Sequence, residues 1–322
     1  MARTILDKFA IPQVAAGLLN FFFTEDDLDF IEKIEEDRFT REEVAALIGP
    51  KADAFIASAY RRGILNLEDE TSGLYKLGSF YGMLDVFSIS ETEKYRSLPR
   101  NTRAQLDAWY FDEYYSSLEQ EPSVRPTQDE ILLLEDVLKF IDAQDRPVYL
   151  NYCDCRSLNG DCALPTRTCI TYKNGPNSFA HRGHSLPIDK EKAKEVVRQA
   201  DRAGLMHTVN PNGICNCCGD CCYLFRGQTR RGSLGFWPKA SHTASLDPDK
   251  CIGCGACTRR CHFGVFEKNS GIVSAHTENC VGCGLCASTC PAKAITMKAR
   301  NNAEQRYGQQ SFDERTETCQ QQ

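Results

Sequence analysis

The sequence has no apolar run long enough to cross a membrane. Its best candidate, residues 9–23, is interrupted by Pro12, Gln13 and Asn20. A membrane-spanning helix needs about 20 consecutive apolar residues, and this stretch also lacks the small-residue cleavage site of a signal peptide. We therefore predict no membrane span, no secretion signal and a cytoplasmic location.

Glycine-rich phosphate-binding motifs are also missing, because neither GxGxxG nor a P-loop occurs. Their absence argues against a nucleotide or flavin site on the chain itself. Positive charge is scarce in the first part of the chain, where residues 1–150 carry 29 acidic against 16 basic side chains. This excess opposes the phosphate attraction that nucleic-acid binding requires, so nucleic acid is not the expected partner.

Cysteine, by contrast, is abundant. The chain has 18 cysteines among 322 residues, and all of them follow residue 150. In the cytoplasm, cysteines at this density are more often metal ligands than a disulfide framework. Residues 151–322 carry 22 basic against 15 acidic side chains, and this surplus can offset the negative charge of thiolates and iron clusters.

The clearest motif is an internal duplication. Residues 251–261 and 280–290 both read C-x2-C-x2-C-x3-C, with starting points 29 residues apart. Three thiolates spaced three residues apart on a tight loop can face one cubane. The glycines of each run, such as Gly253 and Gly282, allow backbone amides to approach the sulfurs. A fourth sulfur has to come from elsewhere, and the duplication supplies it.

The two runs resemble the bacterial ferredoxin pattern, in which each run's fourth cysteine binds the other run's cluster. The resemblance implies two [4Fe–4S] clusters acting as one-electron relays. The implied ligands are Cys251, Cys254, Cys257 and Cys290 for one cluster and Cys280, Cys283, Cys286 and Cys261 for the other. One departure is His262, which stands where the second run has Pro291 and removes no ligand. The alternative is eight thiolates around two zinc ions, but zinc sites usually pair CxxC units.

Nine further cysteines, between residues 153 and 222, form a second group with irregular spacing, which we call the second field. The candidate metal ligands in it are Cys153, Cys155, Cys162, Cys169, Cys215, Cys217, Cys218, Cys221 and Cys222. A CxCR segment at residues 153–156 and an NCCxxCC segment at residues 216–222 precede the ferredoxin runs. This order resembles a group of Cys-rich iron–sulfur proteins of anaerobes. Three interpretations stay open: one or two more iron–sulfur clusters, structural zinc, or a thiol centre that reduces a disulfide or other small substrate.

The sequence pattern of the first 90 residues predicts short helices followed by a hairpin. Thr24 can cap a first helix, Thr40 and Glu43 form a capping box for a second, and a third runs over about 51–62. Residues 64–67 and 74–77 read as two strands around a polar turn. Three helices and a hairpin resemble a winged-helix domain over about residues 20–85. Because the region is acidic, we expect it to dock proteins rather than DNA.

The middle of the chain predicts a small α/β module. Thr127 and Glu130 form another capping box, which predicts a helix carrying Ile131 and Leu134 on its apolar face. A strand at 147–150, a helix from Asp189 to Gly204 and a strand at 205–209 complete the pattern.

We therefore predict an α+β multidomain chain. Its parts are a winged-helix-like domain (1–90), a helical connector and Cys-rich α/β module (91–235), a dicluster ferredoxin domain (236–300) and a polar tail (301–322). The predicted function is single-electron transfer between redox partners, as a subunit of a larger oxidoreductase complex in a low-oxygen setting rather than as a self-contained enzyme. The alternatives are a reductase subunit with a catalytic cluster in the Cys-rich module and a redox-sensing DNA-binding regulator.

Overall fold

A computed structural model of the chain describes residues 4–121, 123–160 and 162–300. The predicted tail at 301–322 lies outside the described residues. The chain forms two compact units, each assembled from separate stretches. The first contains Met1–Glu113, Asn151–Asp161 and Lys173–Pro187, and the second contains Tyr114–Leu150, Cys162–Tyr172 and Ile188–Gln322. The four-part division expected from the sequence stays a prediction.

The first unit begins with short helices. These are α1 (Ile5–Lys8), η1 (Gln13–Leu18), α2 (Leu19–Phe22), α3 (Glu25–Lys33), α4 (Arg41–Ile48), η2 (Gly49–Lys51) and α5 (Ala52–Arg61). The helix starts agree with the sequence: Thr24 caps α3, and Thr40 with Glu43 forms the predicted capping box of α4. Capping satisfies backbone amides that have no partner within the first turn. The fully buried Phe30 then packs against Phe39 and Phe55, with ring centroids 5.4 and 5.1 Å apart.

A hairpin follows these helices, as expected. Strands β1 (Leu65–Leu67) and β2 (Tyr75–Leu77) pair antiparallel, and a bridge from Phe39 to Tyr75 adds a third extended segment. The buried Arg182 donates hydrogen bonds to the Tyr60 and Leu65 carbonyls and to the Asn66 side chain. Helices, hairpin and bridge are elements that a winged-helix domain contains, and membership of that class stays a prediction.

Four more helices belong wholly or largely to the first unit. They are α6 (Phe80–Ser90), α7 (Thr92–Arg96), α8 (Arg100–Ser116) and α10 (Asp154–Asn159). Helix α6 is buried along most of its length. Tyr95 of α7 is also buried, and its hydroxyl donates to the Leu158 carbonyl of α10 at 3.0 Å. The CxCR segment is therefore tied to this helical layer.

A seven-stranded sheet organises the Cys-rich module, which we define as this sheet with the helices around it. In sheet order, its strands are β6 (Leu186–Ile188), β4 (Val148–Asn151), β5 (Cys169–Thr171), β8 (Gly213–Cys217), β7 (Met206–Asn210), β3 (Glu130–Leu132) and β9 (Lys239–Ala240). Strands β7 and β8 form an antiparallel hairpin in which Met206 faces Cys217. This hairpin carries the chain to the NCCxxCC segment.

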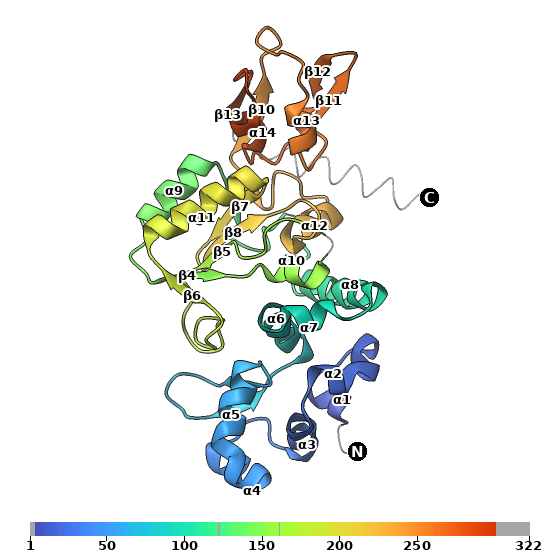
Figure 1. The fold of residues 1–322 in the computed structure, drawn as a ribbon, viewed down its shortest axis with the longest axis vertical. Helices are drawn as coiled ribbons and strands as arrows, with labels where there is room; N and C mark the ends of the chain where they lie inside the picture. The colour runs from blue at the N-terminus through green and yellow to red at the C-terminus, as the bar shows by residue number, and fades with distance from the viewer. Residues whose placement is uncertain (1–3, 122, 161, 301–322) are drawn as a thin grey trace. The chain divides into compact units, whose positions relative to one another are not determined.

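Helices α9 (Leu134–Asp142) and α11 (Lys190–Ala203) lie side by side against this sheet (Figure 1). Their buried Val137, Ile141 and Val197 share a core with Ile214 of β8. As predicted, α11 is capped by Asp189 and ends at Gly204, whose φ of 96° is left-handed. Helix α12 (Tyr223–Arg231) follows the cysteine loop.

The predicted helix start at Thr127 and Glu130 is wrong, because residues 130–132 form strand β3. The Thr127 hydroxyl instead accepts a hydrogen bond from the buried Trp237 indole at 2.7 Å. Glu130 accepts hydrogen bonds from Lys239 at 2.8 Å and Ser241 at 2.7 Å. Tertiary partners therefore use both side chains that would have capped a helix, and α9 begins only at Leu134.

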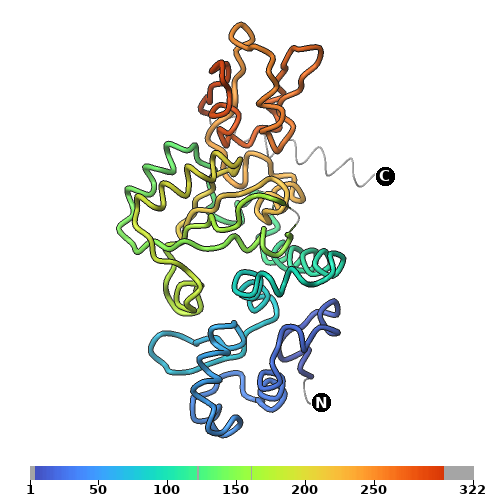
Figure 2. Tube along the Cα trace, in the orientation of Figure 1, coloured from blue at the N-terminus to red at the C-terminus, as the bar shows by residue number. Residues whose placement is uncertain are grey.

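The remaining part, residues 242–299, contains both ferredoxin-like cysteine runs, and we name it the ferredoxin segment. It is bracketed by β10 (His242–Leu246) and β13 (Ile295–Ala299), which pair antiparallel, so the trace returns to where it entered (Figure 2). Between them lie α13 (Ala256–Arg260), the hairpin β11 (Phe266–Asn269) and β12 (Ile272–Ala275), η3 (Thr277–Asn279) and α14 (Leu285–Thr289). Each cysteine run thus contains one short helix.

Candidate metal centres

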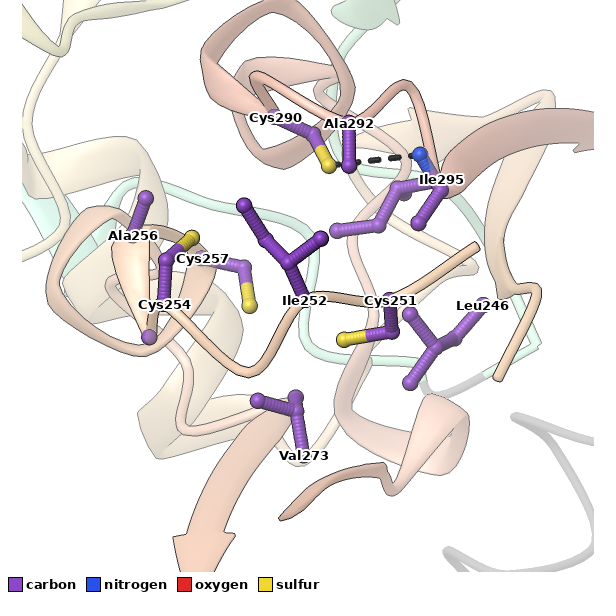
Figure 3. A pocket seen from close by; sticks show the side chains of 12 residues that line it. Leu246, Cys251, Ile252, Cys254, Ala256, Cys257, Val273, Cys290, Ala292 and Ile295 are labelled. Carbon is purple, nitrogen blue, oxygen red and sulfur yellow. Dashed lines mark hydrogen bonds between the residues drawn. The ribbon is translucent and has the colours of Figure 1, made fainter. Parts of the chain in front are cut away.

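A first set of four thiols surrounds a small cavity in the ferredoxin segment. The cavity is lined by Cys251, Cys254 and Cys257 of the first run and by Cys290 of the second. Figure 3 shows these four sulfurs around the Ile252 side chain. The backbone amide of Ala294 donates to the Cys290 sulfur at 3.3 Å. The other lining side chains are apolar, so this first thiol set provides four sulfur ligands in an apolar surrounding.

A second set comprises Cys261, Cys280, Cys283 and Cys286. Burial raises the pKa of the Cys283 thiol to about 12, with the nearby Cys280 and Cys261 sulfurs adding to the effect. Burial and the same neighbours also raise the pKa of Cys286. The amides of Ala244 and Gly282 each donate to the Cys280 sulfur at 3.4 Å. Cys261, from the first run, therefore lies among the three leading cysteines of the second.

Equivalent glycines form the two cysteine loops. Gly253 and Gly282 have φ values of 65° and 73°, a conformation that strains other residues. A Cβ atom at Gly253 would lie 2.1 Å from the Gly271 carbonyl oxygen, and one at Gly282 would lie 2.3 Å from the His242 carbonyl oxygen. Both loops therefore depend on glycine at the same position of the motif for the same steric reason.

The donor sets of the ferredoxin segment fit iron–sulfur cubanes. Each set offers four thiols, amide donors to sulfur and an apolar lining, which are the features that hold and tune such clusters. Within the described part of the chain, no three of these eight sulfurs lie within 4.8 Å of one another. Such spacing suits a polynuclear cluster, because each thiolate there binds a different iron.

The Cys-rich module contains a much tighter group. Ligand atoms of Cys162, Cys218, Asp220 and Cys221 all lie within 4.8 Å of one another. Cys218 and Cys221 are buried, Cys162 is half-buried and Asp220 is exposed. Cys218 follows the end of β8, and Gly219 and Asp220 turn the chain toward α12. We call these four residues the loop site.

Other thiols of the module line strand β8. A hydrogen bond with Cys215, another with Cys222 and burial raise the pKa of Cys217. Strand β5 pairs with β8 so that Ile170 faces Ile214, which places Cys169 opposite Cys215. We call Cys169, Cys215, Cys217 and Cys222 the strand set. Cys217 is therefore close to two other thiols of the set, although among these described residues no three ligand atoms of the set lie mutually within 4.8 Å, as those of the loop site do.

The CxCR segment belongs to the first unit, unlike the other seven cysteines of the second field. Ligand atoms of Cys153, Asp154 and Cys155 lie within 4.8 Å of one another at the start of α10. The half-buried Asp85 of α6 lies nearby, and desolvation of its carboxyl group together with Asp154 raises its pKa. Sequence reasoning missed Asp154 and Asp220 as candidate ligands, although each lies between cysteines of a predicted motif.

The Cys-rich module and the second thiol set share one hydrophobic core. This core contains Cys217, Cys218, Cys221 and Cys222 with Val281 and Leu285, and Cys283 packs against it. The exposed His262 lies beside this core: a Cβ atom on Gly219 would lie 2.4 Å from the His262 Cβ, and the His262 Nε2 lies 2.9 Å from the Gly204 carbonyl oxygen. The histidine that replaces proline in the first run thus fills the contact between the cysteine loop and the ferredoxin segment.

The comparisons with known proteins address this segment. Residues 244–297 match the family model of a 4Fe-4S dicluster domain. A search of curated proteins and a search of solved structures each find no match. The chain therefore contains an iron–sulfur domain of the ferredoxin-like kind, a domain associated with electron transfer between redox partners. No helix among the described residues has the length and apolar character needed to span a membrane.

Proposed function

We propose that the chain relays single electrons between partner proteins through two [4Fe–4S] clusters held by the eight ferredoxin-segment thiols. The observation that carries this proposal is the exchange of cysteines between the runs. Cys290 joins the cavity of the first run, and Cys261 lies among the thiols of the second. Eight sulfurs arranged in this way satisfy two four-ligand clusters and leave no free coordination position. Such clusters, when bound, supply one-electron transfer.

The two thiol sets differ in access. In the first set Cys254 is exposed, and the neighbouring Ile252 has 68% of its surface exposed. In the second set Cys280 and Cys286 are buried, and Cys283 faces the core shared with the Cys-rich module. We infer that an external redox partner docks over Ile252 and Cys254. The second set then connects this entry point to the module.

The strand set is the candidate ligand group for a further cluster. Its four cysteines come from β5, β8 and the start of α12. Cys217 and Cys222 belong to the core against which Cys283 packs, so a cluster there would continue the path from the second thiol set. The chain then acts as an electron-transfer subunit, and its winged-helix-like region docks it onto a larger complex.

Metal analysis after oxygen-free purification tests the proposal. Two ferredoxin clusters predict about 8 iron and 8 sulfide per chain, and a loaded strand set raises each to about 12. Cys261→Ser should remove the second cluster while the first, with all four thiols intact, remains reducible by dithionite in an EPR experiment. Cys290→Ser should do the reverse. Zinc in place of iron, with no acid-labile sulfide, would refute the electron-transfer function.

A further inference from the structure

The loop site joins two segments that are distant in sequence. Cys162 precedes strand β5, whereas Cys218, Asp220 and Cys221 lie in the turn between β8 and α12. The turn is short, and the Asp220 carboxylate accepts a hydrogen bond from the Cys221 amide at 2.9 Å. Three sulfurs and one carboxylate oxygen from these segments therefore lie within 4.8 Å of one another.

The spacing of these atoms distinguishes one metal ion from a cluster. Zinc–sulfur bonds of about 2.3 Å in tetrahedral geometry hold ligand sulfurs about 3.8 Å apart. All four donors of the loop site lie within 4.8 Å of one another, as ligands of one ion must. Cubane ligands are held farther apart because each binds a different corner. The ferredoxin segment shows that wider spacing, since no three of its eight sulfurs come within 4.8 Å in the described structure.

We propose that Cys162, Cys218 and Cys221, with the Asp220 carboxylate, bind one tetrahedral divalent metal ion of the zinc type. Sulfur-rich tetrahedral sites select zinc among ions without redox chemistry of their own. Three thiolates and one carboxylate complete four-coordination, so the site is closed and structural. The ion fastens the Cys162 segment to the cysteine loop, on the side of the module where Gly219 meets His262. This role lies outside the electron path and goes beyond the proposed function.

Zinc-edge X-ray absorption on the purified full-length chain tests the donor set directly. We expect about 1 zinc per chain, with a shell of three sulfurs and one oxygen. A shell of four sulfurs, or a chain that takes up no zinc when zinc is supplied in excess, would overturn the proposal. This measurement uses the wild-type protein, so it does not depend on a variant that folds.

Variants separate the loop site from the strand set. Cys162→Ser should remove the zinc and leave iron and sulfide unchanged, whereas the matched control Cys215→Ser should lower iron and retain zinc. Loss of iron without loss of zinc in Cys162→Ser would show that Cys162 serves a cluster, which contradicts the proposal. The ferredoxin EPR signals in the same samples report on the proposed function separately.

The exposed Asp220 offers a milder test. Loss of an outer-shell partner already weakens metal binding about 10- to 100-fold, so Asp220→Asn should raise the zinc dissociation constant by more than that range. Asp249→Asn, an exposed acidic position in the ferredoxin segment, is the control and should leave zinc affinity unchanged. Equal zinc affinity in the two variants would remove Asp220 from the donor set and refute the site as proposed.

Discussion

The ferredoxin segment and the Cys-rich module both gather cysteines, but their sequences reveal the grouping to different degrees. In the ferredoxin segment a duplicated motif forms two equivalent loops, Cys290 of the second run lines the cavity of the first, and Cys261 of the first run lies near Cys283 of the second. In the module, neighbouring cysteines separate into different groups: Cys217 lies with Cys215 and Cys222, and Cys218 with Cys162 and Cys221. A repeated motif therefore allows the ligand sets to be predicted from the sequence. A strand followed by a turn does not, because it directs adjacent cysteines to different groups.

The largest expected effect comes from removing one cluster ligand in each region. Cys217→Ser should remove the strand-set cluster, a loss of about 4 iron per chain, while the ferredoxin signals persist. Cys283→Ser should remove the second ferredoxin cluster and leave the strand-set iron in place. Iron analysis with EPR checks both variants. If Cys217→Ser leaves the iron content unchanged, the strand set holds no cluster. The two regions then differ in metal, with iron in the ferredoxin segment and zinc in the Cys-rich module.

Two glycine substitutions test whether the cysteine loop needs glycine for steric reasons. Gly282→Ala and Gly264→Ala both place a side chain at positive φ, which costs about 1–2 kcal/mol. Only the first also forces a Cβ against a backbone carbonyl, since nothing lies within 4 Å of a Cβ at Gly264. We expect Gly282→Ala to be about 2 kcal/mol more destabilising than the control and to retain less iron. If circular dichroism gave equal thermal midpoints for the Gly282→Ala and Gly264→Ala variants, the second cysteine loop would have to relax around the added Cβ.

On the module side, Thr127→Val removes the acceptor of the buried Trp237 indole N–H and also the donor to the buried Asp129 carboxylate, while keeping the side-chain shape. An unsatisfied buried donor costs about 1–3 kcal/mol. We expect chemical denaturation, followed by tryptophan fluorescence, to show a loss of this size. Thr258→Val in the ferredoxin segment is the contrast, because its partly buried hydroxyl only donates to the Gly255 carbonyl within its own turn. A larger loss for Thr258→Val would reverse the expected order.

The smallest effect concerns pH. Although burial opposes it, hydrogen bonds from Lys239 and Ser241 lower the pKa of Glu130 overall. A lowered carboxyl pKa stabilises the fold above the unfolded-state pKa, and this contribution is lost as pH falls toward and below the folded value. Because Glu130 is partly exposed, the gain is below about 1 kcal/mol. Glu130→Gln should reduce the difference in unfolding free energy between pH 7 and pH 3.5, and an unchanged difference would contradict this assignment.

Much of the fold could be predicted because local sequence signals, such as helix-capping residues, occur where the folded chain does form helices. The caps at Thr24, Thr40 and Asp189 begin helices as expected. The signal at Thr127 failed because residues 130–132 pair with β7 and β9, and because the indole of Trp237, 110 residues later, donates a hydrogen bond to the Thr127 hydroxyl. The division of the nine irregular cysteines could not be predicted, since it depends on the β5–β8 register and on the turn at Gly219.

Only Ser241 separates strand β9 of the sheet from strand β10 of the ferredoxin segment, and its carbonyl accepts a hydrogen bond from the Arg300 amide at 2.9 Å. A tethered redox domain that swings between stations needs a flexible linker of many residues. Here the connection is the single residue Ser241, and the strands on either side of it, β9 and β10, are each paired with another strand. The spacing between the second thiol set and the module is consequently fixed when the chain folds, so internal electron transfer should be insensitive to solvent viscosity.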